Sequence, residues 1–198
     1  PPKLAPLQVV IIPIFKGDTE LGELTAAALK LKAELESGGI ITKFDNRDTQ
    51  KPGWKFADYE LKGVPVRLAI GPRDLENKTV EVFRRDTLSK ETIPIEKTAG
   101  YVTALLDDIQ KNMLASARKF RDDNTFRVDT WADFRKVLSE TGGFILAHWD
   151  GTAETENRIK EETKATIRCI PFDSHEEEGK CVCSGKPSKR RVLFAVSY

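Results

Sequence analysis

Between residues 54 and 74 the sequence gathers side-chain types that can read the edges of unpaired nucleic-acid bases. A carboxylate can accept two N–H donors of a guanine, and a guanidinium can donate to the guanine O6 and N7. Unpaired bases can also be splayed out and stacked on aromatic rings. The segment supplies charged residues for the edges, two aromatic residues for stacking, and two lysines for phosphates, which position a nucleic acid without reading it. The charged residues are Glu60, Arg67, Arg73 and Asp74. The aromatic residues are Trp54 and Phe56, and the lysines are Lys55 and Lys62.

These residues also have ordinary structural interpretations. Glu60 and Arg67 could pair with each other at a solvated surface, where an ion pair contributes little. Trp54 and Phe56 could belong to the core, and Asp74 could bond backbone amides in a turn. Spacing alone therefore does not decide between base reading and structure.

The composition is that of a folded domain with a heavily charged surface. Of 198 residues, 39% are hydrophobic and 32% are charged, which is not typical of a disordered chain. The formal net charge of +1 is not the strongly basic field of a protein that wraps duplex phosphate, so any nucleic-acid recognition would be local. With no membrane-spanning run and no signal peptide, the expected location is the cytoplasm, away from membranes. Because Pro1 is not a natural start residue, we expect a fragment.

The elements predicted to position the charged residues alternate between strands and helices. Apolar runs predict strands at residues 8–14, 40–45, 64–70 and 79–84, and apolar residues at helical spacing predict helices from Leu21 and over residues 98–120. Residues 46–62 show no sustained period and are predicted as a long loop with one helical turn, a type of loop that is often functional. The alternation predicts an α/β fold with a mixed, mostly parallel sheet flanked by helices.

A polar segment at residues 121–124 is predicted as a boundary between domains 1–122 and 123–198. Beyond it, Thr130 and Asp133 form a capping-box pattern that opens a short helix over residues 130–141. Strands are predicted at residues 144–148, 166–170 and 192–196, a charged helix at 154–163, and a polar loop at 173–191. This second domain is therefore a smaller α/β unit.

Signatures of common enzymes do not follow any predicted strand. There is no glycine-rich dinucleotide fingerprint, Walker loop or nucleophile elbow, and the sequence contains only two histidines. A standalone catalytic site is therefore not expected. Two alternatives to nucleic-acid binding stay open: an α/β domain that binds a small ligand, and a module that binds another protein.

The three cysteines, Cys169, Cys181 and Cys183, do not predict a disulfide framework, because their number is odd and no secretory signal is present. A metal set would combine them with His175 or His148. The single-residue gap between Cys181 and Cys183 is tighter than the usual spacing, and Cys169 reads as an inward strand residue. His148, on an apolar strand, is predicted to be a satisfied core histidine.

Several strings resemble the C-terminal half of prolyl-tRNA synthetases of the archaeal and eukaryotic-like type, which some bacteria also have. The opening PPKLAPLQVV resembles the junction that leaves the catalytic core, and PGWKFADYELKGVPVR at residues 52–67 and GPRD at 71–74 resemble the anticodon-binding domain. The string IKEETKATIRCIP at 159–171 and the closing Ser197 and Tyr198 resemble the extra C-terminal domain. The resemblance covers the whole chain, without the class II catalytic motifs.

The resemblance implies binding to the anticodon loop of tRNA-Pro, with no activation of proline by this chain alone. Proline codons begin with two cytosines, so the matching anticodon bases are two guanines. By resemblance, Glu60 and Arg67 are the primary guanine readers, Arg73 and Asp74 come second, and Tyr198 contacts the catalytic domain of the same polypeptide. ATP and Mg²⁺ would belong to that catalytic core of a proline–tRNA ligase, a homodimer, whereas the fragment is expected to be a monomer.

The resemblance also implies the loss of a zinc site. Many members of the family hold zinc through four cysteines, and the corresponding positions here are Asp150, Thr155, Cys181 and Ser184. Structural zinc needs four nitrogen or sulfur ligands, so no zinc is expected. The small domain would then be held together by its apolar strands and by the packing of Trp149.

Overall fold

The computed structural model describes residues 1–197, and the chain divides into two compact units, Pro1–Ser116 and Ala117–Tyr198. The contact predicted for Tyr198 lies outside the described residues. Most of the polar segment predicted as the boundary belongs to the last turn of helix α4 (Thr98–Asp123), which extends three residues beyond its predicted end. Within residues 1–197, no helix combines the length and apolar character needed to cross a bilayer.

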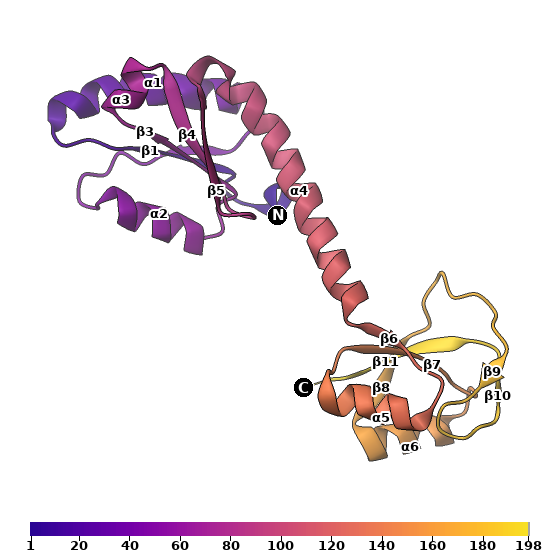
Figure 1. The fold of residues 1–198 in the computed structure, drawn as a ribbon. Helices are drawn as coiled ribbons and strands as arrows, with labels where there is room; N and C mark the ends of the chain where they lie inside the picture. The colour runs from indigo at the N-terminus through magenta and orange to yellow at the C-terminus, as the bar shows by residue number, and fades with distance from the viewer. Residues whose placement is uncertain (198) are drawn as a thin grey trace. The chain divides into compact units, whose positions relative to one another are not determined.

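The first unit is built on a five-stranded sheet with the order β2-β1-β3-β4-β5 (Figure 1). Strand β1 is parallel to both β2 and β3, whereas β3–β4 and β4–β5 are antiparallel. The mixed sheet is confirmed, with as many parallel as antiparallel pairs, and β5 was not predicted. The strands are β1 (Val9–Pro13), β2 (Thr42–Phe44), β3 (Val66–Ile70), β4 (Thr79–Arg84) and β5 (Ser89–Pro94).

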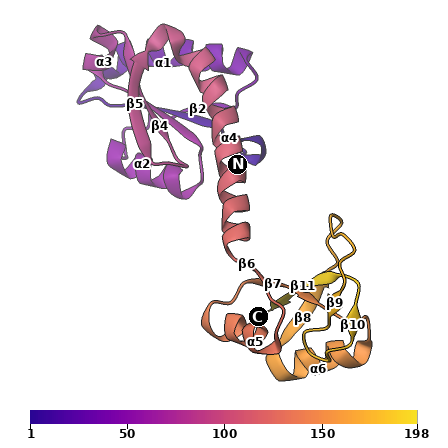
Figure 2. The same cartoon turned by 45° about the vertical axis from the view of Figure 1, so that its right-hand side comes forward.

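Helices cover both faces of this sheet. Successive strand side chains point to opposite faces, so Val9 and Ile11 of β1 join one core with α1 (Asp18–Ser37) and α4. Val10 and Ile12 face the other side, where Tyr59 of α2 (Pro52–Leu61) packs on them. Figure 2 shows α1 and α2 on opposite sides of the strands. The remaining helical segments are η1 (Pro2–Leu4), α3 (Pro72–Glu76) and η2 (Ile95–Lys97).

Helix α2 corrects the prediction of a long loop over residues 46–62. Pro52 stands in its first turn, where a missing N–H costs nothing. Its inward positions are taken by Lys55, Phe56 and Tyr59, which follow helical spacing. Because one of the buried side chains is a lysine, the apolar pattern that normally reveals a helix is broken.

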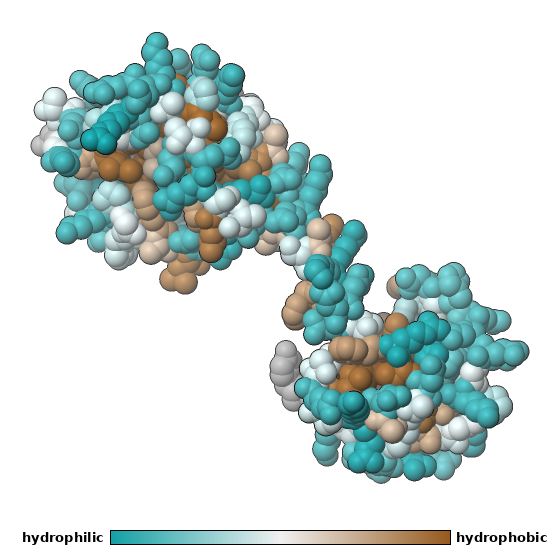
Figure 3. All heavy atoms as spheres, in the orientation of Figure 1, coloured by the Kyte–Doolittle hydropathy of each residue, from teal (hydrophilic) through white to brown (hydrophobic). Residues whose placement is uncertain are grey.

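The second unit has a four-stranded sheet with the order β6-β7-β11-β8. Strand β6 (Thr125–Arg127) is parallel to β7 (Phe144–His148), and β11 (Arg191–Val196) is antiparallel to both β7 and β8 (Ala165–Cys169). Helices α5 (Trp131–Glu140) and α6 (Ala153–Thr163) pack on the sheet, and β9 (Gly179–Lys180) and β10 (Pro187–Ser188) form a small hairpin. The second α/β unit is therefore confirmed. On both units, the face seen in Figure 3 is mostly hydrophilic.

Candidate nucleic-acid interface

Arg67 is the second residue of β3 and lies on the sheet face that α2 covers. Its neighbour across the antiparallel ladder is Phe83 of β4. The guanidinium carbon lies 3.7 Å from the ring centroid of Phe56 on α2 and 4.4 Å from that of Phe83. A guanidinium is attracted to the face of an aromatic ring within about 6 Å. The two phenylalanines therefore hold the Arg67 head group between them.

The hydrogen bonding of Arg67 is incomplete. The residue is 6% exposed, and its Nη2 lies 3.4 Å from Oε1 of Glu81, near the outer limit for a hydrogen bond. Its Nε has no hydrogen-bond partner among the residues that the structure describes. Burial lowers the pKa of Arg67, and the charge of Glu81 offsets this only in part. A buried donor without an acceptor costs about 1–3 kcal/mol, so a ligand acceptor at Nε would be stabilising.

Glu60 lies near the end of α2 and is half-buried. Burial lowers the pKa of Arg67, and the charge of Glu60 acts against this less than Glu81 does. In residues 1–197 the two predicted guanine readers form no ion pair with each other, so the interpretation as a solvated surface pair does not apply. The side chain of Arg67 is 7% exposed. A base can therefore reach it only after a neighbouring side chain moves.

Trp54 and Phe56 occupy different environments on α2. Trp54 is 49% exposed, and the guanidinium carbon of Arg47 lies 5.9 Å from its ring centroid. Phe56 is half-buried, with one ring face against Arg67. Of the two aromatic residues predicted to stack on bases, Trp54 has the more accessible ring, whereas Phe56 supports Arg67.

Lys55 is not placed to contact a phosphate, which corrects the role predicted for it. It is 1% exposed, and its Nζ donates to the backbone oxygens of Asp45 at 3.0 Å and Arg47 at 2.5 Å. The ammonium group therefore stabilises the segment before α2. Lys62 is different: its side chain is 58% exposed and donates to Asp58 at 2.6 Å. Its predicted phosphate contact stays a prediction.

A buried charged cluster that the sequence analysis missed fixes the segment between β2 and α2. Asp45 accepts two hydrogen bonds from the Arg47 guanidinium, at 2.8 and 2.6 Å, one from the Arg47 backbone N–H at 3.3 Å and one from the Tyr59 hydroxyl at 3.0 Å. Burial would raise the pKa of Asp45, but these bonds and the charge of Lys55 outweigh burial and hold it well below its ordinary value. Burial and Asp45 raise the pKa of Tyr59 to about 12. Sequence offers no signal for which charges in this polar segment turn inward.

Arg73 and Asp74 lie at the carboxyl ends of the parallel strands β1 and β3, away from the ring pair around Arg67. Oδ2 of Asp74 accepts the backbone N–H of Gly71 at 2.8 Å, which confirms the turn interpretation for that oxygen. Both residues line a hollow of about 390 Å³ with Lys16 and Glu20. Helices α1 and α2 leave this edge on opposite faces of the sheet, an arrangement that in α/β proteins places ligands beyond the strand ends.

Three of the four positions that the resemblance matches to zinc ligands are joined by hydrogen bonds. The carboxylate of Asp150 accepts from the hydroxyls of Thr152 at 2.8 Å, Thr155 at 2.9 Å and Ser184 at 2.6 Å. Burial would raise the pKa of Asp150, but these bonds outweigh it and lower the pKa to about 2. The fourth position, Cys181, is buried. Within residues 1–197, no three His, Cys, Asp or Glu side chains are grouped to hold a metal ion.

The alternative cysteine set is also spread apart. Cys169 is exposed, so the prediction of an inward strand residue is wrong for it. The last ladder positions of β8 lie beside a register shift against β11, which ends the regular alternation. His148 is buried with Nδ1 3.1 Å from the Ser188 hydroxyl, as predicted for a satisfied core histidine.

Comparison with known proteins shows two family matches and close relatives. A family described as anticodon binding domain matches residues 8–105, and one described as prolyl-tRNA synthetase, C-terminal, matches residues 131–198. Proline–tRNA ligase of Phocaeicola vulgatus is 57% identical over 201 residues. Those of Porphyromonas gingivalis strain W83 and Christiangramia forsetii are 56% and 54% identical over 198 residues. Each match covers 100% of this chain and 40% of the relative.

Proposed function

Because the chain belongs to the prolyl-tRNA synthetase family, as its anticodon-binding and C-terminal domains, we propose that its first unit reads the two anticodon guanines of tRNA-Pro. The catalytic domain of the family lies outside this chain, which spans 40% of the length of the curated relatives it matches. The unit binds unpaired loop bases that are splayed out from the RNA, the usual target of sequence-specific RNA recognition.

The observation that carries this proposal is the buried Nε of Arg67, which has no hydrogen-bond partner in the described part of the chain, on a side chain held between Phe56 and Phe83. The O6 and N7 atoms of guanine are acceptors that a guanidinium can bind together. Glu60, half-buried near the end of α2, accepts the N1–H and N2–H donors of guanine. The acid thus matches the donors of a guanine, and the arginine matches its acceptors.

The remaining predicted residues take supporting roles. Arg73 and Asp74 contact the RNA from the hollow at the strand ends, and the exposed ring of Trp54 stacks on a base. Lys62, which is exposed, contacts a phosphate and positions the RNA without reading it.

The parent protein is an ATP-dependent proline–tRNA ligase of the cytoplasm, which attaches proline to tRNA during protein synthesis. ATP and Mg²⁺ bind its catalytic domain, which also contacts the C-terminal unit, and the parent is a homodimer. The chain alone is a catalytically inactive monomer. Its second unit functions without zinc, because a carboxylate and two hydroxyls in place of three thiolates make a poor zinc site.

The test is binding of the chain to tRNA-Pro transcripts at fixed salt, with each anticodon guanine replaced in turn. We expect each replacement to weaken binding, and Glu60→Ala or Arg67→Ala to reduce the discrimination by about 1–3 kcal/mol each. The matched control is Arg135→Ala, which removes an exposed arginine of α5 and should leave the discrimination unchanged. Equal binding of tRNA-Pro and an unrelated tRNA would contradict the proposal. Binding of an amino acid or a protein partner without RNA would favour the alternatives.

A further inference from the structure

Glu81 of β4 joins two cations on the sheet face of Arg67. Its Oε1 lies 3.4 Å from Nη2 of Arg67 and 3.5 Å from Nζ of Lys90. Lys90 stands on β5 directly opposite Phe83, so the two cations flank the carboxylate from neighbouring strands. The side chain of Glu81 is 32% exposed. A single carboxylate oxygen of Glu81 therefore offsets part of the positive charge of both Arg67 and Lys90.

A comparison with Arg47 shows how loosely Glu81 holds Arg67. The Nε and Nη2 atoms of Arg47 donate together to the Asp45 carboxylate, at 2.8 and 2.6 Å. On Arg67 the corresponding Nη2 is 3.4 Å from Glu81, and Nε has no partner among the described residues. A bidentate acceptor could bind that edge once a neighbouring side chain has moved, because the side chain of Arg67 is 7% exposed. Glu81 thus orients the guanidinium without saturating it.

We propose that Glu81 is a positioning residue that makes this site select a base edge over a phosphate. This inference rests on the proposed anticodon function. Two adjacent cations without an acid would attract the phosphate backbone, which carries no sequence information. With Glu81 in place, one charge is offset and the Nε edge of Arg67 stays directed to a neutral acceptor such as guanine O6 and N7.

The test compares the chain with its Glu81→Gln and Glu81→Asp variants. Dissociation constants are measured over a salt series for tRNA-Pro transcripts with the native anticodon and with each guanine replaced. For Glu81→Gln we expect the discrimination ratio to fall about tenfold and the salt dependence to steepen by about one ion. The shorter Glu81→Asp side chain keeps the charge and should give an intermediate ratio.

Glu96→Gln is the control of equal charge change, because Glu96 is exposed and lines a separate hollow with Leu31 and Leu75. It should leave the discrimination ratio unchanged. If Glu81→Gln alters only the melting temperature and keeps the ratio, Glu81 is merely structural and the inference is wrong, although the proposed function stands. If the unsubstituted chain shows no dependence on the guanines, the proposed function itself fails. Should Glu81→Gln not fold by circular dichroism, an unchanged ratio in Glu81→Asp contradicts the inference.

Discussion

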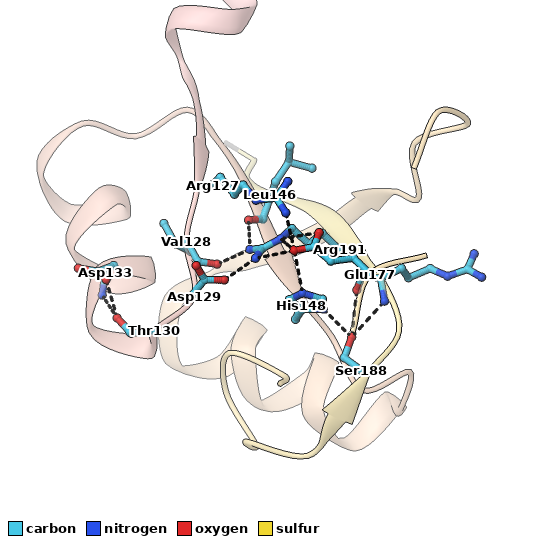
Figure 4. A network of polar contacts seen from close by, with 11 residues as sticks. Arg127, Val128, Asp129, Thr130, Asp133, Leu146, His148, Glu177, Ser188 and Arg191 are labelled. Carbon is cyan, nitrogen blue, oxygen red and sulfur yellow. Dashed lines mark hydrogen bonds and ion pairs between the residues drawn. The ribbon is translucent and has the colours of Figure 1, made fainter. Parts of the chain in front are cut away.

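The two units each bury an arginine in a sheet, and the two side chains are used in opposite ways. Arg191 of the second unit donates Nη1 to the backbone oxygen of Val128 at 2.8 Å, Nη2 to Asp129, and Nε to Glu177 at 3.3 Å (Figure 4). Burial acts to lower its pKa, but the bonds to Glu177 and Asp129 outweigh burial and raise it. For Arg67, burial wins and the pKa is lowered.

The difference separates a structural arginine from one available to a ligand. Arg191 joins the loop of Glu177 to the sheet, and all three of its guanidinium nitrogens have partners. Arg67 is held mainly by two aromatic rings, and within residues 1–197 its Nε has no acceptor. Exposed fractions of 8% and 6% do not distinguish the two residues, whereas their hydrogen bonds do.

Arg191→Ala should have the largest effect on stability. It removes the donor of the Val128 oxygen and of Asp129, and one of the two arginine donors of Glu177, which keeps Arg127. The carboxylates of Asp129 and Glu177 are 72% and 37% exposed and become hydrated, whereas the buried Val128 oxygen is left unsatisfied. That costs about 1–3 kcal/mol, so the second unit should melt earlier in calorimetry. A loss below about 1 kcal/mol would show that Arg191 is not a structural arginine.

Arg67→Met, in contrast to Arg191→Ala, should leave stability nearly unchanged and should weaken the discrimination between tRNAs. The methionine fills the space between Phe56 and Phe83 and removes an unpaired buried donor, so the free energy of unfolding should change by less than about 1 kcal/mol. Discrimination between native and guanine-replaced tRNA-Pro should fall by about 1–3 kcal/mol. Destabilisation comparable to that of Arg191→Ala, with the discrimination kept, would remove the distinction between the two arginines.

Glu177→Gln should flatten the acid dependence of stability. Hydrogen bonds from Arg191 and Arg127 lower the pKa of Glu177 from 4.5 to about 2. A carboxylate with a lowered folded-state pKa contributes stability above its unfolded pKa, and that contribution is lost as the pH falls. Between pH 4.5 and pH 2, urea unfolding should show a steeper loss for the parent chain than for the variant. Parallel curves would show that Glu177 contributes nothing through its charge.

Removal of metal should have no effect on the stability of the second unit. The hydroxyls of Thr155 and Ser184 donate to Asp150, and this network joins the segments that a metal would otherwise hold. A chelator should leave the melting temperature of the second unit unchanged, whereas Asp150→Ala should lower it. A chelator-induced decrease, or stoichiometric zinc by atomic absorption, would contradict this.

The strands and helices that could be predicted are those with an unbroken pattern. The continuous apolar run of β1 and the apolar spacing of α1 and α4 reflect burial directly. Helix α2 was missed because Lys55, one of its inward residues, is charged. Strand β5 was missed because its residues are mostly exposed, with Ile93 the buried exception.

The candidate site was found only in part for a related reason. Arg67 and Glu60 could be selected by residue type and by resemblance, because both lie in one contiguous string. Phe83 and Glu81 could not, since they reach Arg67 through antiparallel pairing of β3 and β4, and a sequence does not display that register. The inward direction of Lys55 likewise depends on the carbonyl groups that it meets in the folded chain.

The most direct test of the central claim is NMR observation of the arginine Nε–H groups as an anticodon stem-loop of tRNA-Pro is added. We expect the Arg67 Nε–H signal to shift and to become protected from exchange with the native stem-loop and not with a guanine-replaced one. The Arg191 signal, whose Nε is already bonded to Glu177, should stay in place as the internal control. Binding of the native stem-loop with no change at Arg67 would contradict the account.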